Sequence, residues 1–298
     1  MIRILGTIFA GLFGLAFGSF LNVCLSRWPE GESVVQPRSH CRQCNRTLAW
    51  WENVPLVSWL ALRGRCRTCR TWIGWRTPLV ELAVGVLWAV SAWQALDSSL
   101  SLDSLPVFFY MAVALMVGHA IFYWLLVALA LLDAENLWLP NWLTLPGIVL
   151  GLLFAVLRAT LSAAMPLIDK SGSMKYAAGR TALDSILGIF VAAGLILLIR
   201  WIYWLIRHRE GIGLGDAKLM ALLAAWLGLP GALLAFGLGV TLGALVAVVL
   251  LAVPSSKRDL RGWAAQKLPL GTFLCIGGVV SSLWGGLMIA AYLRWAGF

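Results

Sequence analysis

Two aspartates lie at the ends of strongly apolar stretches, where a carboxylate is costly to place. Asp133 closes one stretch in "LALLDAENLWLPNW", and Asp216 opens another in "GLGDAKLM". Ionisable side chains in membrane-spanning segments are expensive to bury and usually mark function. Two carboxylates held together in a low-dielectric site cannot easily both ionise, so they share one proton. Such a pair supplies a general base and a general acid for the attack of water on a carbonyl group.

Glycines occupy every second position before Asp216: Gly211, Gly213 and Gly215. Because they lack a Cβ atom, they allow the chain to approach another helix or an extended peptide closely. Each aspartate also has a simpler explanation, since Asp216 could cap a helix and Asp133 could be a loop residue beyond a helix end. Their occurrence together within this glycine frame favours a catalytic pair. Lys218 is interpreted either as an anchor at the membrane surface or as a contact to substrate.

A second set of residues, with metal-binding chemistry, lies in the segment 27–77. "CRQC" and "CRTC" supply two C-x-x-C pairs, Cys41 with Cys44 and Cys66 with Cys69. Each pair offers two thiolates for one edge of a tetrahedron, the geometry of structural zinc. Four ligands leave no open position for catalysis, and the metal would staple a segment of about 50 residues that has little core of its own. We therefore predict a four-cysteine zinc site, with an iron–sulfur cluster or two disulfides as the alternatives.

The composition indicates which elements position these groups. Of 298 residues, 61% are hydrophobic and 12% are charged, and the mean hydropathy is +0.86. A soluble domain carries about 25% charged residues, roughly twice this share. The 17 tryptophans suit membrane–water interfaces, which aromatic residues favour. We therefore predict an all-α polytopic membrane protein, in which Cys24 and Cys275 act as small buried hydrophobes.

Apolar runs of about 20 residues, the length of a helix that spans a bilayer, recur along the chain. They predict about eight transmembrane helices: 4–25, 78–96, 107–132, 140–158, 184–206, 216–229, 231–253 and 269–293. The sixth is short for a bilayer, and we expect Pro146 and Gly147 to interrupt the fourth. Irregular backbone at membrane depth has to face protein or water.

Positive charge predicts the orientation of these helices. Nine arginines lie in 27–77, and the connections after the fifth and seventh spans are also basic, whereas 97–106 has no cation. The positive-inside rule places the basic connections in the cytoplasm and brings Asp133 and Asp216 to the same cytoplasmic face. The cations of loop 159–183 do not fit this pattern. The net charge of +10 is interpreted as a topology signal with attraction to anionic lipid, and we expect no nucleic-acid partner.

Four ordered segments together resemble the type IV prepilin peptidases, which are membrane-embedded aspartyl proteases with a G-x-G-D motif. The segments are "GSFLNVCLSRWP", "RSHCRQCNRTLAWWENVPLVSWLALRGRCRTCR", "LLDAENLWLPNWLTLP" and "REGIGLGDAKLMALLAAWLG". The resemblance extends over nearly the whole chain in the family's order. The sequence departs from the common pattern at Asn141, which follows Pro140 where many relatives have aspartate.

The resemblance implies a bifunctional enzyme of the bacterial inner membrane. It would cleave the short basic leader from type IV prepilin or pseudopilin precursors at the cytoplasmic face, as in type IV pilus assembly and type II secretion. It would then methylate the new N-terminus with S-adenosylmethionine as the methyl donor. Carried onto this chain, the catalytic pair is Asp133 and Asp216, framed by Gly213, Gly215 and Lys218.

The resemblance also divides the chain into three segments. These are a first transmembrane helix at 1–26, a cytoplasmic zinc-binding segment with the methyltransferase region at 27–77, and the protease at 78–298. Methyl transfer is placed in 18–53, which includes Glu52. The residues themselves show no glycine-rich strand–helix unit for a cofactor, and Glu52 could be a solvated loop residue.

Two other classes of protein stay open from the residues alone. An ion- or proton-coupled transporter also places carboxylates in interrupted membrane helices, but it would show paired repeats and charges near the bilayer midplane. A non-catalytic pilus-assembly scaffold would use the zinc segment and leave both aspartates unexplained. The partners we expect are prepilin or pseudopilin precursors and membrane lipid.

Overall fold

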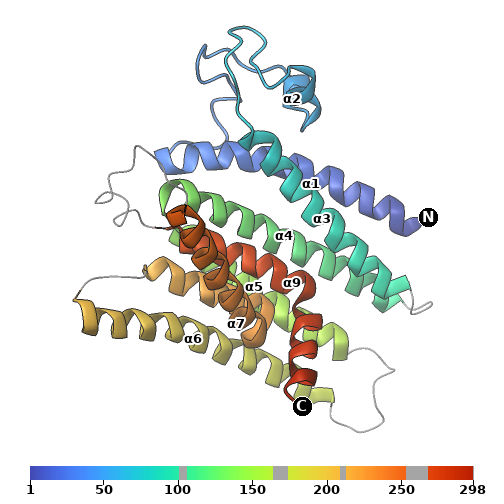
Figure 1. Cartoon of the computed structure of the whole chain (residues 1–298). Helices are drawn as coiled ribbons and strands as arrows, with labels where there is room; N and C mark the ends of the chain where they lie inside the picture. The colour runs from blue at the N-terminus through green and yellow to red at the C-terminus, as the bar shows by residue number, and fades with distance from the viewer. Residues whose placement is uncertain (101–105, 164–173, 209–212, 253–267, 298) are drawn as a thin grey trace. The chain divides into compact units, whose positions relative to one another are not determined.

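The structure, a computed structural model of the whole chain, describes residues 1–100, 106–163, 174–208, 213–252 and 268–297. Seven helices in this described part are long and apolar enough to cross a membrane. They are α1 (Ile2–Arg27), α3 (Arg76–Leu100), α4 (Pro106–Asn136), α5 (Asn141–Ala163), α6 (Met174–Arg207), α7 (Leu214–Ala252) and α9 (Leu270–Trp295) (Figure 1). The short elements are η1 (Trp28–Glu30), η2 (Trp50–Asn53) and α2 (Val57–Ala61). Because the described residues form only two isolated β-bridges and no strand, the predicted all-α membrane fold is confirmed.

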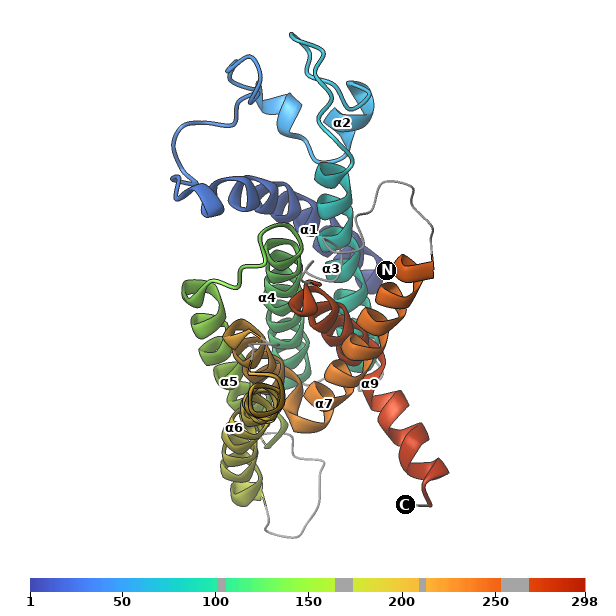
Figure 2. The same ribbon diagram turned by 60° about the vertical axis from the view of Figure 1, so that its left-hand side comes forward.

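Helix α7 accounts for two of the predicted spans, 216–229 and 231–253. Its backbone leaves the helical conformation at Gly228 (φ 72°, ψ 171°), two residues before Pro230. Figure 2 shows the later arm of α7 turning away from the earlier one. The earlier arm, 214–227, is roughly 20 Å long at about 1.5 Å per residue, which is short for a bilayer core of about 30 Å. The eight predicted spans therefore correspond to seven helices in the described part of the chain.

A cavity of about 340 Å³ adjoins the break in α7. The charged residues Arg158 and Asp184 and the buried Ser185 line it together with Gly228 and Pro230. Irregular backbone within a membrane is tolerated where it is covered by protein or faces a polar cavity. The surroundings of the break meet this condition.

The expected interruption of the fourth span is wrong, because α5 runs unbroken through Pro146. This proline lies near the start of the helix, where its missing N–H group removes one backbone hydrogen bond. Trp226 of α7 donates its indole N–H to the carbonyl of Gly147 at 2.9 Å. A Cβ atom added at Gly151 would lie 2.6 Å from the Trp226 ring, so this glycine admits the indole against α5. Helix α7 therefore packs against α5 immediately after the proline.

Packing divides the chain into two compact units, Met1–Ala128 and Leu129–Phe298. The boundary falls inside α4, so the last turns of this helix, with Asp133, belong to the second unit. The functional division into three segments that the sequence predicts, with boundaries after residues 26 and 77, stays a prediction.

Glycines hold α1 against α3 in the first unit. A Cβ atom added at Gly14 would lie 2.9 Å from the Cα of Gly85, and one added at Gly18 would lie 2.7 Å from the Cα of Glu81. Residue numbers rise along α1 as they fall along α3, so the two helices are antiparallel. Small residues let helix backbones approach closely, which is a principal way of packing helices in membranes. The ends of α1 and α3 that flank the cysteine segment are thus fixed to each other.

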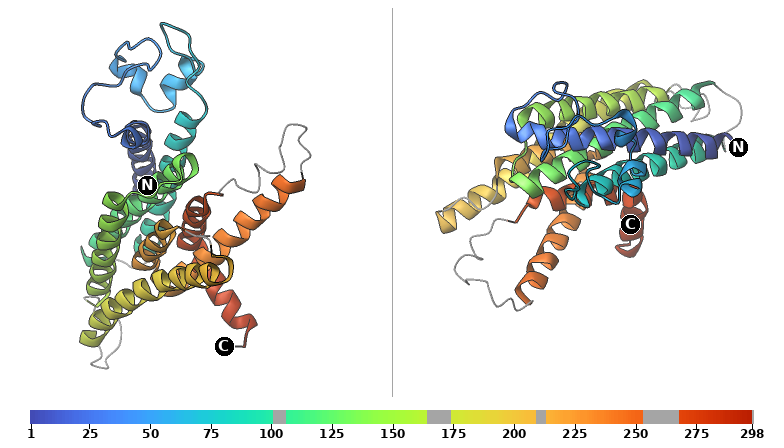
Figure 3. Two further views of the ribbon diagram at one scale, coloured as in Figure 1. Left: turned by 90° about the vertical axis from the view of Figure 1, so that its left-hand side faces the viewer. Right: turned by 90° about the horizontal axis from the view of Figure 1, so that it is seen from above.

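The earlier arm of α7 forms the core of the second unit, since every residue from Leu219 to Trp226 is buried. The later arm packs on α9, where a Cβ atom added at Gly239 would lie 3.1 Å from the Cα of Leu274. In both views of Figure 3 this later arm (orange) points away from α6 (gold). The buried earlier arm gives a rigid support to its first turn, which carries Asp216.

Candidate active site and metal centre

Both predicted catalytic aspartates lie in the second unit and are buried. Asp133, in the last turn of α4, is 6% exposed, and Asp216, in the first turn of α7, is 9% exposed. The two carboxylates are close enough to interact electrostatically. The fold therefore brings two acidic residues that are far apart in the sequence to one site.

Leu139, in the connection between α4 and α5, packs between the first turns of α7 and α9. A Cβ atom added at Gly215 would lie 3.0 Å from Leu139 Cδ1, and one added at Gly271 would lie 3.2 Å from the same atom. The atom added at Gly271 would also lie 2.9 Å from Asp133 Oδ2. These two glycines therefore allow the starts of two helices to converge beside Asp133.

The first turn of α9 orients the Asp133 carboxylate. The backbone N–H of Thr272 donates to Asp133 Oδ2 at 2.8 Å, and the Thr272 hydroxyl donates to the carbonyl of Ala130 at 2.8 Å. The first N–H groups of a helix have no partners within it, and the helix dipole favours a negative charge there, typically by about 0.3–1 kcal/mol. This contact offsets part of the cost of placing a carboxylate at the site.

Sequence reasoning missed Gly271 and Thr272, although "PLGT" (269–272) carries a signal for them. Proline and threonine are typical of helix starts, and a glycine between them leaves room for a neighbouring chain. The hydrogen bond from Thr272 to Asp133 could not be predicted from the sequence, because 139 positions separate the two residues. Only the packing of α9 against α4 joins them.

Asp216 uses one carboxylate oxygen as a helix cap. Its Oδ2 accepts a hydrogen bond from the backbone N–H of Gly213, three residues before it, at 3.2 Å, which is the bond that an acidic residue at the third helical position makes in a capping box. A Cβ atom added at Gly213 would lie 3.4 Å from that oxygen, an ordinary contact, so the tight approach depends on Gly215 and not on Gly213. Gly211 lies outside the described residues. A helix cap explains why an aspartate occurs at position 216, but it does not explain why this aspartate lies close to Asp133.

Lys218 bonds to the amino end of α5. Its Nζ donates to Asn141 Oδ1 at 2.5 Å. The acceptor, Asn141, is a neutral amide. The contact joins the starts of α5 and α7 beside Asp216. Lys218 therefore has a structural role, which was not among the two expected roles of membrane anchor and substrate contact.

The four predicted metal ligands lie together in the first unit, where two equivalent turns present them. The N–H of Asn45 donates to the carbonyl of Cys41 at 2.8 Å, and the N–H of Arg70 donates to that of Cys66 at 3.0 Å. Each turn ends in a residue of positive φ, 52° at Asn45 and 58° at Arg70. Repetition of one turn geometry brings two thiols from each C-x-x-C pair to the same centre.

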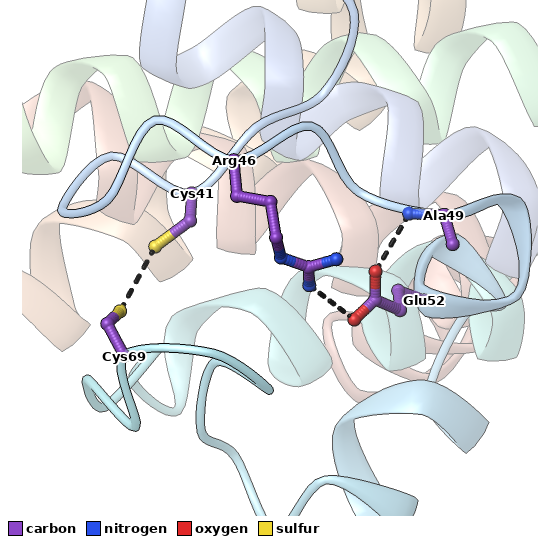
Figure 4. Close-up of polar contacts among 5 residues, drawn as sticks. All are labelled: Cys41, Arg46, Ala49, Glu52 and Cys69. Carbon is purple, nitrogen blue, oxygen red and sulfur yellow. Dashed lines mark hydrogen bonds and ion pairs between the residues drawn. The ribbon is translucent and has the colours of Figure 1, made fainter.

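The sulfur atoms fit a tetrahedral metal. All four lie within 4.8 Å of one another, and the Sγ atoms of Cys41 and Cys69 face each other at 3.7 Å (Figure 4). Zn–S bonds of about 2.3 Å give tetrahedral edges of roughly 3.8 Å. The four cysteines are free thiols, so the two pairs are not disulfides. Hydrogen bonding with the Thr71 side chain lowers the pKa of the Cys69 thiol to about 6, toward the thiolate that binds a metal.

Glu52 is buried, at 7% exposed, and is not the solvated loop residue that the sequence left open. Its Oε1 forms an ion pair with Arg46 at 2.6 Å, and its Oε2 accepts the N–H of Ala49 at 2.8 Å (Figure 4). The hydrogen bond from Arg46 holds the pKa of Glu52 below its usual range. Because Arg46 follows Cys44 by two residues, the ion pair connects the first cysteine turn to η2.

A cavity of about 670 Å³ with both polar and apolar walls lies in the first unit, within the size range of small-molecule sites. The end of α1, the start of α3 and residues between 39 and 73 line it. Its wall combines carboxylates, guanidinium groups, amides and indoles, including Arg27, Glu52, Asn53, Trp59 and Glu81. This chemistry suits a ligand that carries both charges and an aromatic ring.

Fold and site together define a multi-pass helical membrane protein with a buried carboxylate pair and a four-cysteine centre. Residues 12–95 match the Bacterial Peptidase A24 N-terminal domain, and residues 120–248 match the Type IV leader peptidase family. The chain belongs to the type IV leader peptidase family.

Curated relatives described as "Prepilin leader peptidase/N-methyltransferase" match over almost their full length. The relative from Pseudomonas putida is 33% identical over 97% of this chain and 94% of its own. Those from Pseudomonas aeruginosa and Stutzerimonas stutzeri are 31% and 30% identical, each over 96% of this chain and 93% of its own. No solved structure matches. The resemblance is confirmed, and with it the enzyme class of a peptidase combined with a methyltransferase.

Proposed function

We propose that this chain cleaves the basic leader from type IV prepilin or pseudopilin precursors, with Asp133 and Asp216 as the catalytic pair. The observation that carries the proposal is the burial of both carboxylates at one site, each hydrogen-bonded to a backbone N–H at a helix start. The family and the names of its relatives supply the substrate class.

The carboxylate pair acts on water. Two carboxyl groups held together away from bulk solvent share one proton. The ionised member takes a proton from water as the water oxygen attacks the scissile carbonyl carbon, and the protonated member donates a hydrogen bond to the carbonyl oxygen. The N–H groups of Thr272 and Gly213 do not touch the substrate in this scheme. They hold the two carboxyl groups in place.

The reaction takes place at the cytoplasmic face of the bacterial inner membrane. Asp133 lies in the last turn of α4 and Asp216 in the first turn of α7, so both are at helix ends, and the positive-inside rule assigns these ends to the cytoplasm. An apolar precursor helix would lie among the spans, with its leader at the surface beside the pair. This position argues against an ion-coupled transporter, whose charged groups lie near the midplane.

We propose the cavity of the first unit as the methyl-transfer site. S-adenosylmethionine, when bound, would supply an activated methyl group to the new N-terminal amine. The arginines of the cavity suit its carboxylate, the acidic side chains suit its ammonium group, and the Trp59 ring suits its purine. Glu52 and Glu81 already accept backbone N–H groups, from Ala49 and Leu56 respectively, at 2.8 Å. They therefore shape the wall of the cavity.

Zinc in the four-cysteine centre would hold the segment 27–77 together without taking part in either reaction. Four thiolates fill its coordination shell and leave no position for water or substrate. Through the ion pair of Arg46 and Glu52, the metal would also fix η2 at the wall of the cavity.

Substitution of each aspartate tests the catalytic pair. Asp133→Asn and Asp216→Asn should each abolish leader release, because asparagine keeps the shape of the side chain but neither takes nor shares the proton. Glu135→Gln, which changes an exposed carboxylate of the same helix turn, should keep parental leader release. Methyl transfer to a precursor supplied already cleaved should survive in both Asn variants, since it requires no activation of water.

The two activities are measured separately on each variant, as released leader and as incorporated methyl groups. Appreciable leader release by either Asn variant would refute the catalytic pair. Loss of both activities in a folded variant would agree with Asp133 and Asp216 as the catalytic pair, but it would refute the separation of the peptidase and methyl-transfer sites.

A further inference from the structure

Five exposed apolar side chains occur in the short extramembrane stretch before α3. Val57 and Leu60 are 62% and 67% exposed, and Trp72, Ile73 and Trp75 are 48%, 45% and 62% exposed. We refer to these five as the apolar surface. A cluster of exposed apolar side chains outside the membrane spans marks a site of interaction. We therefore expect the apolar surface to bind a partner.

The apolar surface belongs to one small packed body. Trp59, on α2, packs with its ring centroid 4.6 Å from that of Trp75 and 5.7 Å from that of Trp72. Its indole N–H donates to the carbonyl of Gly74 at 3.0 Å. The side of α2 that carries Trp59 is therefore fixed against residues 72–75. Val57 and Leu60, three positions apart, share another face of α2, and that face stays exposed.

This body is attached directly at the end of a membrane span. The candidate span of α3 begins at Arg76, and the carbonyl of Trp75 accepts the N–H of Leu79 at 3.2 Å, so Trp75 is the residue that starts the helix. Asn22 of α1 donates to the carbonyl of Thr77 at 3.0 Å, which ties the ends of the two spans together. Figure 2 shows α2 beside the start of α3. Tryptophan at such a position lies at the level of the lipid headgroups, where it is favoured.

The charge of the same stretch identifies the partner. Residues 57–76 contain five arginines and no acidic residue, and four of these are exposed: Arg63, Arg65, Arg67 and Arg70. Clusters of basic residues next to a transmembrane helix attract anionic phospholipids. A second copy of this chain would bring the same positive charge and be repelled. An anionic lipid surface matches both the apolar and the charged groups.

We propose that α2 and residues 72–75 lie on the membrane leaflet at which α3 begins. The apolar surface enters the interfacial region of the bilayer, and the arginines contact lipid phosphate groups. The cysteine centre, whose second pair lies between α2 and residue 72, is thereby held at the membrane surface. The contact does not depend on the catalytic pair, whereas Trp72 and Ile73 of the apolar surface also line the cavity of the first unit.

A photo-crosslinking experiment on the full-length protein tests the proposal. Leu60 and Trp75 are replaced, one at a time, by the photoreactive residue p-benzoylphenylalanine, and the protein is placed in lipid nanodiscs of phosphatidylcholine with phosphatidylglycerol. Trp50 is the matched control position, because it lies in the same extramembrane segment and is 76% exposed, more than Trp75. Retained leader release in each variant shows that the chain is folded.

Positions 60 and 75 should yield phospholipid adducts several-fold above position 50. The yield at position 60 should fall when phosphatidylglycerol is replaced by phosphatidylcholine, since the arginines lose their anionic partners. Equal lipid adducts at the three positions would overturn the proposal, because the contact would then not be specific to this face. Crosslinks from position 60 or 75 to another protein chain in place of lipid would also overturn it.

Discussion

The substitution Gly271→Ala probes how the fold holds the catalytic pair. An alanine Cβ atom at this position would lie 2.9 Å from Asp133 Oδ2, 3.0 Å from its Cγ and 3.2 Å from Leu139 Cδ1. These separations are several tenths of an ångström too short, so a neighbour has to move. The Asp133 carboxylate, whose Oδ2 accepts the N–H of Thr272 at 2.8 Å and lies 3.4 Å from the Thr272 hydroxyl, is the group that relieves the clash by leaving its short hydrogen bond.

The expected loss follows from that hydrogen bond. A hydrogen bond to a charged group contributes about 1.5–3 kcal/mol, and each 1.36 kcal/mol lost from the transition state lowers the rate about tenfold. The kcat for leader release should therefore fall about 10- to 150-fold. The KM should change little, because the substitution acts on the carboxylate and leaves the binding of the precursor's apolar helix intact.

A second glycine of α9 provides the matched control. A Cβ atom added at Gly286 would meet no atom within 4 Å, so Gly286→Ala makes the same chemical change in the same helix without the clash. It should keep parental kcat and KM. Methyl transfer to an already cleaved precursor should be unchanged in both variants, which separates a displaced carboxylate from a misfolded chain.

The hydroxyl of Thr272 gives an independent check on the same element. Thr272→Val removes the hydrogen bond to the carbonyl of Ala130 and should lower kcat, whereas Thr272→Ser keeps the hydroxyl and should restore it. Parental kcat in Gly271→Ala, with the Asp133→Asn variant inactive, would refute the role of α9 while leaving the catalytic pair in place.

Two further predictions concern the cysteine segment. Elemental analysis of the purified protein should find about one zinc per chain, and Cys41→Ser should lower the zinc content and make residues 27–77 more sensitive to proteolysis; iron, or no metal, would contradict the assignment. A cysteine engineered at the exposed Gln36 should react with a membrane-impermeant thiol reagent only after cells are permeabilised, with the parent protein as the reference. Labelling of that cysteine in intact cells would contradict the cytoplasmic location of the segment.

The sequence by itself determined the features that are written locally. Each span is a predominantly apolar run, so hydropathy alone predicted the membrane helices of the structure, with α7 counted as two spans. The spacing of the two C-x-x-C pairs predicted a four-sulfur centre, because each pair is a single tight turn whose geometry depends on adjacent residues. The two aspartates stood out because a carboxylate at the end of an apolar run is costly wherever the run is placed.

Other features were decided only by the tertiary structure, because they depend on residues that are distant in the sequence. Pro146 was expected to break its helix, but α5 runs unbroken through it, and the indole of Trp226 packs against the next residue, Gly147. The sequence left Glu52 open as a solvated residue, yet Arg46 pairs with it and buries it. Thr272 orients Asp133 across 139 positions of the chain. Hydropathy and spacing indicate the environment that each residue favours. Which distant residue it contacts is decided only when the helices pack.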